Sequence, residues 1–299
     1  PAARGLFHRA AIQSGAALTT TADRAAALAE EVAAAAGVPA VADLASLSVA
    51  ALLDAQTAVE ARHGGMPFVP VLDGDVIPGD PIDALRRGVA SSVPTVVGTN
   101  LDEWRLLAMG DTRRAELTLE RVAGRIARSI GGDAERAGAL VDEVRAIRAA
   151  RGASAEPVDV WCAIETERTF RIPSARLADA LTEGGTPTWS YLFEWPSPAE
   201  DGWLGACHVL DVPFVFGWPG RADIAWFTGT GPEADLLAAQ MGAAWTAHAR
   251  HGDPSTDEVP WPRHDPSTRP TVVFGRRTRL EHAPWDDQRS AVARALGAG

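Results

Sequence analysis

Short apolar runs alternate along this chain with longer stretches of helical periodicity. Continuous apolar runs are typical of strands buried on both faces of a parallel sheet. We expect such strands at residues 9–14 (RAAIQS), 93–98 (VPTVVG) and 189–195 (WSYLFEW). Because helical stretches separate them, the pattern predicts an α/β fold with a mostly parallel sheet.

The helical stretches have recognisable start and stop residues. Thr21 can cap the first and Gly37 can end it, whereas Gly64-Gly65 breaks the second. Pro173 should disturb a later helix, because proline lacks the backbone N–H. We expect helices over residues 22–36, 49–61, 81–87, 117–130, 133–150, 158–169 and 233–251.

Two further segments are expected to form hairpins. Residues 68–77 alternate around Asp73-Gly74, a pair typical of a tight turn. Residues 271–281 surround Gly275 in the same way. Both hairpins should be structural.

Composition excludes several function classes. The chain has 299 residues, 46% of them hydrophobic, and a formal net charge of −11 without any lysine. Such a charge argues against a nucleic-acid partner, which requires clustered basic side chains. No apolar run approaches the roughly 20 residues of a membrane span. Residues 227–231 (FTGTG) lack the lysine of a phosphate-binding loop.

The two cysteines and one histidine pair are residue types that can carry redox or metal chemistry. Cys162 and Cys207 could form a disulfide or remain free thiols, and we favour a buried apolar role for Cys207. His248 and His251 lie one helical turn apart, but no third ligand accompanies them. We therefore predict no metal and no cofactor.

Catalytic residue types follow two of the predicted strands. Asp102 and Glu103 come directly after residues 93–98, and His208 follows residues 189–195. An acid after one strand and a histidine after the next is the later half of an α/β-hydrolase triad. His208 could instead only hydrogen-bond a loop. Of the two carboxylates, one should face the site and the other solvent or a helix N-terminus.

The motifs around these residues resemble those of the type-B carboxylesterases, the esterase and lipase group that includes the cholinesterases. Residues 98–103 match a G-T/S-N-x-D-E segment, and residues 205–217 match G-x-x-H-x-x-E-x-x-F-x-F-G except that Asp211 replaces the glutamate. The resemblance also covers residues 1–15, 67–78, 170–177, 252–254 and 261–262.

This resemblance implies an α/β-hydrolase fold. The chain would be the C-terminal portion of the central, mostly parallel sheet, with residues 1–299 in one domain and a helical cap over about 105–185. Glu103 would be the triad acid, His208 the base, and Ser14 a serine that supports the acid. Trp104 replaces a glycine of many members, and Glu167 replaces an aspartate.

The nucleophile of the family is missing. No G-x-S-x-G segment occurs, and Ser154 in residues 152–156 (GASAE) lacks the second glycine. We therefore expect the chain to be the C-terminal part of an esterase, with the serine outside it.

Two function classes remain open. The first is hydrolysis of a small-molecule carboxylic ester; the second is an inactive, esterase-like binding or adhesion module. The presence of both Glu103 and His208 favours the enzyme. A stand-alone domain of other function would expose a long sheet edge. Residues that could line an apolar substrate pocket, or equally belong to the core, are Trp104, Leu106, Leu107, Phe214 and Phe216.

Overall fold

The computed structural model describes residues 3–15, 17–63 and 67–297. The chain forms two compact units: a smaller one within residues 17–84, and a larger one that combines residues 5–15 with residues 85–297. All of the candidate catalytic residues belong to the larger unit.

The smaller unit is built from two helices and a short two-stranded sheet. Its elements are β2 (Thr20–Thr21), α1 (Ala22–Ala35), a 3₁₀ turn (Val41–Ser46), α2 (Val49–His63) and β3 (Val71–Leu72). The Thr21 hydroxyl accepts a hydrogen bond from the N–H of Arg24 at 3.3 Å, as expected of the cap. The predicted break at Gly64-Gly65 lies outside the described residues.

The hairpin expected at residues 68–77 is wrong. β3 pairs in parallel with β2, so its backbone partner is a distant segment rather than the residues that follow it. Asp73 accepts hydrogen bonds from the N–H groups of Asp75 and Ile77 at 3.0 and 2.9 Å. This side chain thus uses donors that a returning strand would have needed for its ladder.

The larger unit contains the central sheet, in the order β1-β4-β5-β6-β7. The parallel strands are β1 (Ala10–Gln13), β4 (Thr95–Asn100), β5 (Thr188–Phe193) and β6 (Pro270–Phe274); β7 (Arg279–His282) is antiparallel. The parallel sheet and the last hairpin are therefore confirmed. β4 is fully buried, whereas β1 is only partly buried, because among the described residues it pairs with β4 alone.

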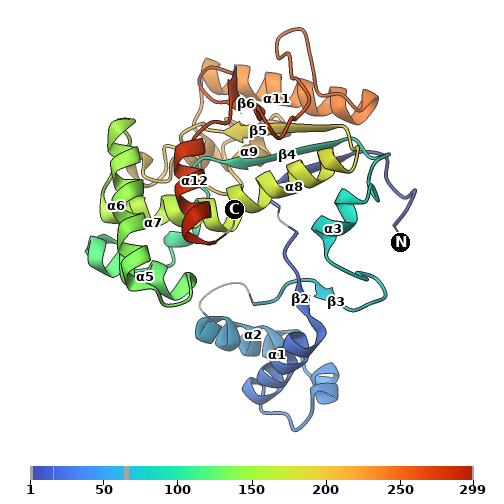
Figure 1. Cartoon of the computed structure of the whole chain (residues 1–299), viewed down its shortest axis with the longest axis vertical. Coiled ribbons are helices and arrows are strands. Elements are labelled where there is room, and N and C mark those ends of the chain that lie inside the picture. The colour runs from blue at the N-terminus through green and yellow to red at the C-terminus, as the bar shows by residue number, and fades with distance from the viewer. Residues whose placement is uncertain (1–2, 16, 64–66, 298–299) are drawn as a thin grey trace. The chain divides into compact units, whose positions relative to one another are not determined.

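Strand β5 shows how the two faces of the sheet differ. Its alternate residues Trp189, Tyr191 and Phe193 belong to the apolar core formed with α9 (Asp211–Val215) and α11 (Pro232–His251). Ser190 and Leu192 point to the other face, which α8 (Ile172–Glu183) covers. Figure 1 shows the sheet between α8 and α11.

A second core lies among helices beside the sheet. It joins α5 (Leu119–Ser129), α6 (Ala134–Ala150), α7 (Pro157–Thr166) and α12 (Asp286–Ala295). The shorter helices are α3 (Pro81–Arg86), α4 (Trp104–Ala108) and α10 (Ala225–Thr228). The expected helices are confirmed. The disturbance near Pro173 is a π-helical turn, Glu167–Arg171, between α7 and α8.

Gly98 in β4 allows a close approach between two strands. A Cβ at this position would lie 2.1 Å from the ring of Tyr191 on β5. The ring occupies that space and reaches Asp211, to which its hydroxyl donates a hydrogen bond at 2.8 Å. A glycine at position 98 is thus required by the packing of a buried tyrosine.

Gly98→Ala should lower the free energy of unfolding by about 1–3 kcal/mol, because the added methyl overpacks the core. The matched control is Gly124→Ala in α5, where a Cβ meets nothing within 4 Å. There we expect a gain of up to about 1 kcal/mol from helix propensity. Urea denaturation of both variants measures the difference, and equal effects would contradict this account of Gly98.

Candidate active site

Glu103 and His208 meet at the carboxyl edge of the sheet. Glu103 lies in the turn after β4, and His208 in the turns after β5 and before α9. Nδ1 of His208 lies 2.7 Å from Oε2 of Glu103. The Glu103 side chain is 0% exposed, whereas that of His208 is 32% exposed. A buried carboxylate therefore orients an imidazole that remains accessible.

The second oxygen of Glu103 is also occupied. Oε1 accepts a hydrogen bond from the N–H of Asn100 at 2.6 Å and another from the hydroxyl of Ser14. Ser14 follows β1 and has a φ of 60°, a region that few residues other than glycine adopt. The serine expected to support the acid is thus in direct contact with it.

The backbone and one aromatic ring orient His208. The next residue, Val209, has a φ of 63°, which is unfavourable for a β-branched side chain. The ring of Phe170, from the π-helical turn, lies 5.1 Å from the imidazole, centroid to centroid. Strained backbone conformations persist where surrounding contacts hold them in place. Ser14 and Val209 are two such residues, and they lie beside Glu103 and His208 respectively.

The environment of His208 raises the pKa of its imidazole above the ordinary value of 6.5. The hydrogen bond to Glu103 is the main cause, burial opposes it, and the charges of Glu103 and Asp211 add to it. The pair therefore favours the imidazolium, the form that a triad base takes when it has accepted a proton.

Asp102 directly precedes Glu103, the N-cap of α4, so it lies at a helix N-terminus, one of its two expected positions, and it also contacts the loop that carries His208. Its N–H donates to the carbonyl of Ala206 at 2.9 Å, and its Oδ2 accepts from the N–H of Ala206 at 3.1 Å. Gly205 is required beside it, since a Cβ there would lie 2.4 Å from Oδ2. Asp102 therefore positions the histidine loop.

Asp211 is a buried acceptor rather than a simple cap for the turn that follows it. Its carboxylate accepts from the side-chain amides of Gln13 and Asn100, at 2.7 and 3.2 Å, and from the hydroxyl of Tyr191 at 2.8 Å. Asn100 also donates to the carbonyl of Cys207 at 2.7 Å. Sequence analysis missed these donors, although a buried asparagine at a strand end, next to two carboxylates, was a usable signal.

The candidate pocket residues separate into different environments. Phe214 is buried in the core, whereas Phe216 is 61% exposed. Trp104 packs edge-to-face on Trp161, with ring centroids 6.3 Å apart, against the helical core. Leu106 packs against the core formed by β5, α9 and α11, and Leu107 is exposed.

The remaining sequence candidates have structural surroundings. Cys162 and Cys207 are buried free thiols, and burial raises the pKa of each to about 12. His248 contacts the carbonyl of Ala10 at 3.0 Å. Glu167, which is buried, accepts hydrogen bonds from Arg171 at 2.5 Å and from a side-chain amide of α12. No metal-binding cluster of His, Cys, Asp or Glu occurs within the described ranges.

Comparison with known proteins identifies the family. The model of the carboxylesterase family matches residues 1–289. The chain belongs to the carboxylesterase family. It is 27% identical to the para-nitrobenzyl esterase of Bacillus subtilis (strain 168), across 99% of this chain and 59% of the relative. It is 30% identical to the bile salt-activated lipase of Mus musculus, across 67% of this chain and 34% of the relative.

Solved structures agree with the family assignment. A carboxylesterase of Geobacillus stearothermophilus matches with a TM-score of 0.78 and 32% identity, over 97% of this carboxylesterase chain and 59% of that chain. A para-nitrobenzyl esterase structure matches with a TM-score of 0.77 and 26% identity, over 98% and 59%. The fold is that of the α/β-hydrolases, as expected. None of the helices that the structure describes is long and apolar enough to cross a membrane.

The pKa of His208 should fall in Glu103→Gln, because the neutral amide no longer stabilises the imidazolium. NMR titration of the His208 ring protons measures this change. Circular dichroism of the variant checks that its fold is retained.

The same pKa determines how pH affects stability. Because folding raises the pKa of His208, the Glu103–His208 pair contributes its full stabilisation of the fold below the pKa of the unfolded chain, near 6.5. That contribution is lost as pH rises through the folded value.

An unchanged His208 midpoint in Glu103→Gln would show that the hydrogen bond is not what raises the pKa.

Proposed function

We propose that this protein hydrolyses carboxylic esters with a Ser-His-Glu triad in which Glu103 is the acid and His208 the base. The observation that carries the proposal is the 2.7 Å contact between Nδ1 of His208 and Oε2 of the fully buried Glu103. This is the contact by which a triad acid orients its base.

The contact determines which nitrogen can act as base. Because a carboxylate only accepts hydrogen bonds, Nδ1 of a neutral His208 carries the proton and Nε2 has a free lone pair. Nε2 would remove the proton from a serine hydroxyl as its oxygen attacks the ester carbonyl carbon. It would then protonate the leaving alcohol, which leaves an acyl-enzyme. Nε2 would next take a proton from water as the water oxygen attacks the acyl carbon, and would return that proton to the serine oxygen as the carboxylic acid leaves.

The serine would come from outside these 299 residues, since they contain no G-x-S-x-G segment. Ser154, in the loop before α7, is a poor candidate, because its hydroxyl donates to Asp159 in that helix. Ser14 is also poorly suited, because its hydroxyl is committed to Glu103. Its role in the proposal is to keep the Glu103 carboxylate in place together with the N–H of Asn100.

The substrate class follows from the family and from the names of its members. Bacillus subtilis para-nitrobenzyl esterase covers nearly the whole chain, so we propose a small-molecule ester as substrate. We also propose that residues 1–299 are part of one α/β-hydrolase domain, in which the helices between about 105 and 185 form a cap. No cofactor enters the proposed reaction.

An esterase-like binding module remains the second candidate. It would retain the fold without turnover. What favours the enzyme is that the acid and base are in contact, with both acid oxygens satisfied. A binding module has no need for such an arrangement, or for an accessible imidazole.

The complete protein should hydrolyse p-nitrophenyl butyrate, and His208→Ala should reduce kcat by about 10⁶, the size of the loss when a triad base is removed. Glu103→Gln should also be severe, because the amide cannot stabilise the imidazolium. In the free enzyme, kcat/KM should rise with pH through the raised pKa of His208, since only the neutral imidazole accepts a proton.

Controls separate the two candidate functions. His248→Gln, which replaces a histidine away from the pair, should keep the activity if the fold is retained by circular dichroism. The 299-residue chain alone should show no turnover above background. Saturable turnover by the chain alone would mean that it contains a nucleophile, and a complete protein that is inactive on every ester would favour the binding module.

A further inference from the structure

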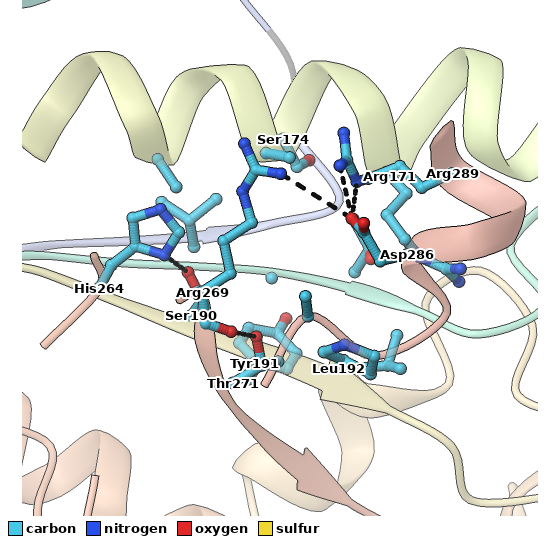
Figure 2. A pocket seen from close by; sticks show the side chains of 17 residues that line it. Arg171, Ser174, Ser190, Tyr191, Leu192, His264, Arg269, Thr271, Asp286 and Arg289 are labelled. Carbon is cyan, nitrogen blue, oxygen red and sulfur yellow. Dashed lines mark hydrogen bonds and ion pairs between the residues drawn. The ribbon is translucent and has the colours of Figure 1, made fainter. Parts of the chain in front are cut away.

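Arginines with little exposure to solvent connect distant segments at two places in the larger unit. Around the cavity between α8 and the sheet, Arg269 and Arg289 turn towards the carboxylate of Asp286 (Figure 2). Those charges are balanced within the chain. The other place is α4, directly after the turn that carries the proposed triad acid, where the side chain of Arg105 is only 12% exposed.

Arg105 holds groups from three different segments. One of its terminal nitrogens, Nη1, donates a hydrogen bond to the backbone carbonyl of Trp203. Its Nε lies 3.3 Å from Oδ1 of Asp102, and its Nη2 lies 3.1 Å from Oδ1 of Asp159 in α7. The guanidinium thus joins the turn after β4, the helical region and the loop before His208.

The loop before His208 is also held through Asp102. The N–H of Asp102 donates to the carbonyl of Ala206 at 2.9 Å, and its Oδ2 accepts from the N–H of Ala206 at 3.1 Å. The other oxygen of this carboxylate faces Arg105. Arg105 therefore acts on the loop twice, directly at Trp203 and through Asp102 at Ala206.

The charges around Arg105 are balanced by a second arginine. Arg148 in α6 is 6% exposed; burial lowers the pKa of its guanidinium, and the charges of Asp102 and Asp159 oppose that effect. Two carboxylates thus face two guanidinium groups. Loss of Arg105 would leave one largely buried carboxylate uncompensated, and it would also remove a fixed donor to the loop.

We propose that Arg105 is a positioning residue for His208. It fixes the preceding loop at Trp203 and Ala206, so that the imidazole stays in contact with Glu103. A guanidinium suits this role because its planar fork donates in several fixed directions at once. The effect on turnover rests on the proposed esterase function, whereas the effect on the imidazole does not.

Arg105→Gln in the complete protein should lower kcat for p-nitrophenyl butyrate by about 10–100-fold, since a base misplaced by about 1 Å can cost that much. KM should change by less than about twofold, because the base acts in the transition state. The NMR titration midpoint of His208 should fall, because a longer contact with Glu103 stabilises the imidazolium less. A merely structural role would lower only the free energy of unfolding, which urea denaturation measures.

Two further variants separate position from charge. Asp159→Asn added to Arg105→Gln restores the charge balance but not the donor to Trp203, so kcat should stay low. Arg105→Lys keeps the charge without the planar fork. Its kcat and its His208 midpoint should lie between the values of the wild type and of Arg105→Gln.

Arg114→Gln is the matched control. Arg114 also lies over the ring of Trp203, 5.2 Å from its centroid, but its hydrogen bonds reach the side chain of Glu200 and the carbonyl of Met109. This substitution should leave kcat and the His208 midpoint unchanged.

Either an unchanged kcat or an unchanged His208 midpoint in Arg105→Gln would overturn the proposal. Equal loss in Arg114→Gln, or full recovery by Asp159→Asn, would do so as well. If Arg105→Gln does not fold, wild-type values in Arg105→Lys would decide against the proposal. A complete protein without esterase activity would refute the proposed function alone; a lowered His208 midpoint in Arg105→Gln would then still support the positioning role, and an unchanged one would overturn it.

Discussion

The structure around the candidate site depends on one buried carboxylate. Glu103 is fully removed from water, and a carboxylate in that position is costly unless its oxygens are satisfied. The hydroxyl of Ser14, the N–H of Asn100 and the imidazole of His208 satisfy them. These partners come from the ends of β1, β4 and the segment after β5, so the carboxylate requires the parallel sheet to bring three distant segments together.

A second set of buried contacts keeps this geometry in register. Gly98 leaves room for the ring of Tyr191, whose hydroxyl reaches Asp211 three residues after His208. Asn100 joins the end of β4 to the carbonyl of Cys207. Asp102 pairs with the backbone of Ala206 from the other side. The histidine is thus positioned by the strand that carries the acid, and not only by its own loop.

The helical region connects to the same turn through Arg171. The π-helical turn between α7 and α8 places Phe170 against His208 and Arg171 against the carbonyl of Leu101. Pro173 has no backbone N–H to donate, so a regular helix through it would leave one carbonyl without its partner. The wider π-helical turn lies where the regular hydrogen-bond pattern is interrupted. Arg171 therefore joins the helical region to the turn that carries Glu103.

The sequence by itself predicted the strands β1, β4 and β5, the hairpin of β6 and β7, seven of the twelve α-helices in the described residues, and the contact between Glu103 and His208. Those features follow from local periodicity, capping residues and motif spacing, which a chain displays without its fold. Only the tertiary structure decided that residues 68–77 pair with β2 in parallel, that Asp102 contacts the histidine loop and that Trp104 packs on Trp161. Each of these contacts depends on a partner distant in sequence, which no local pattern along the chain displays.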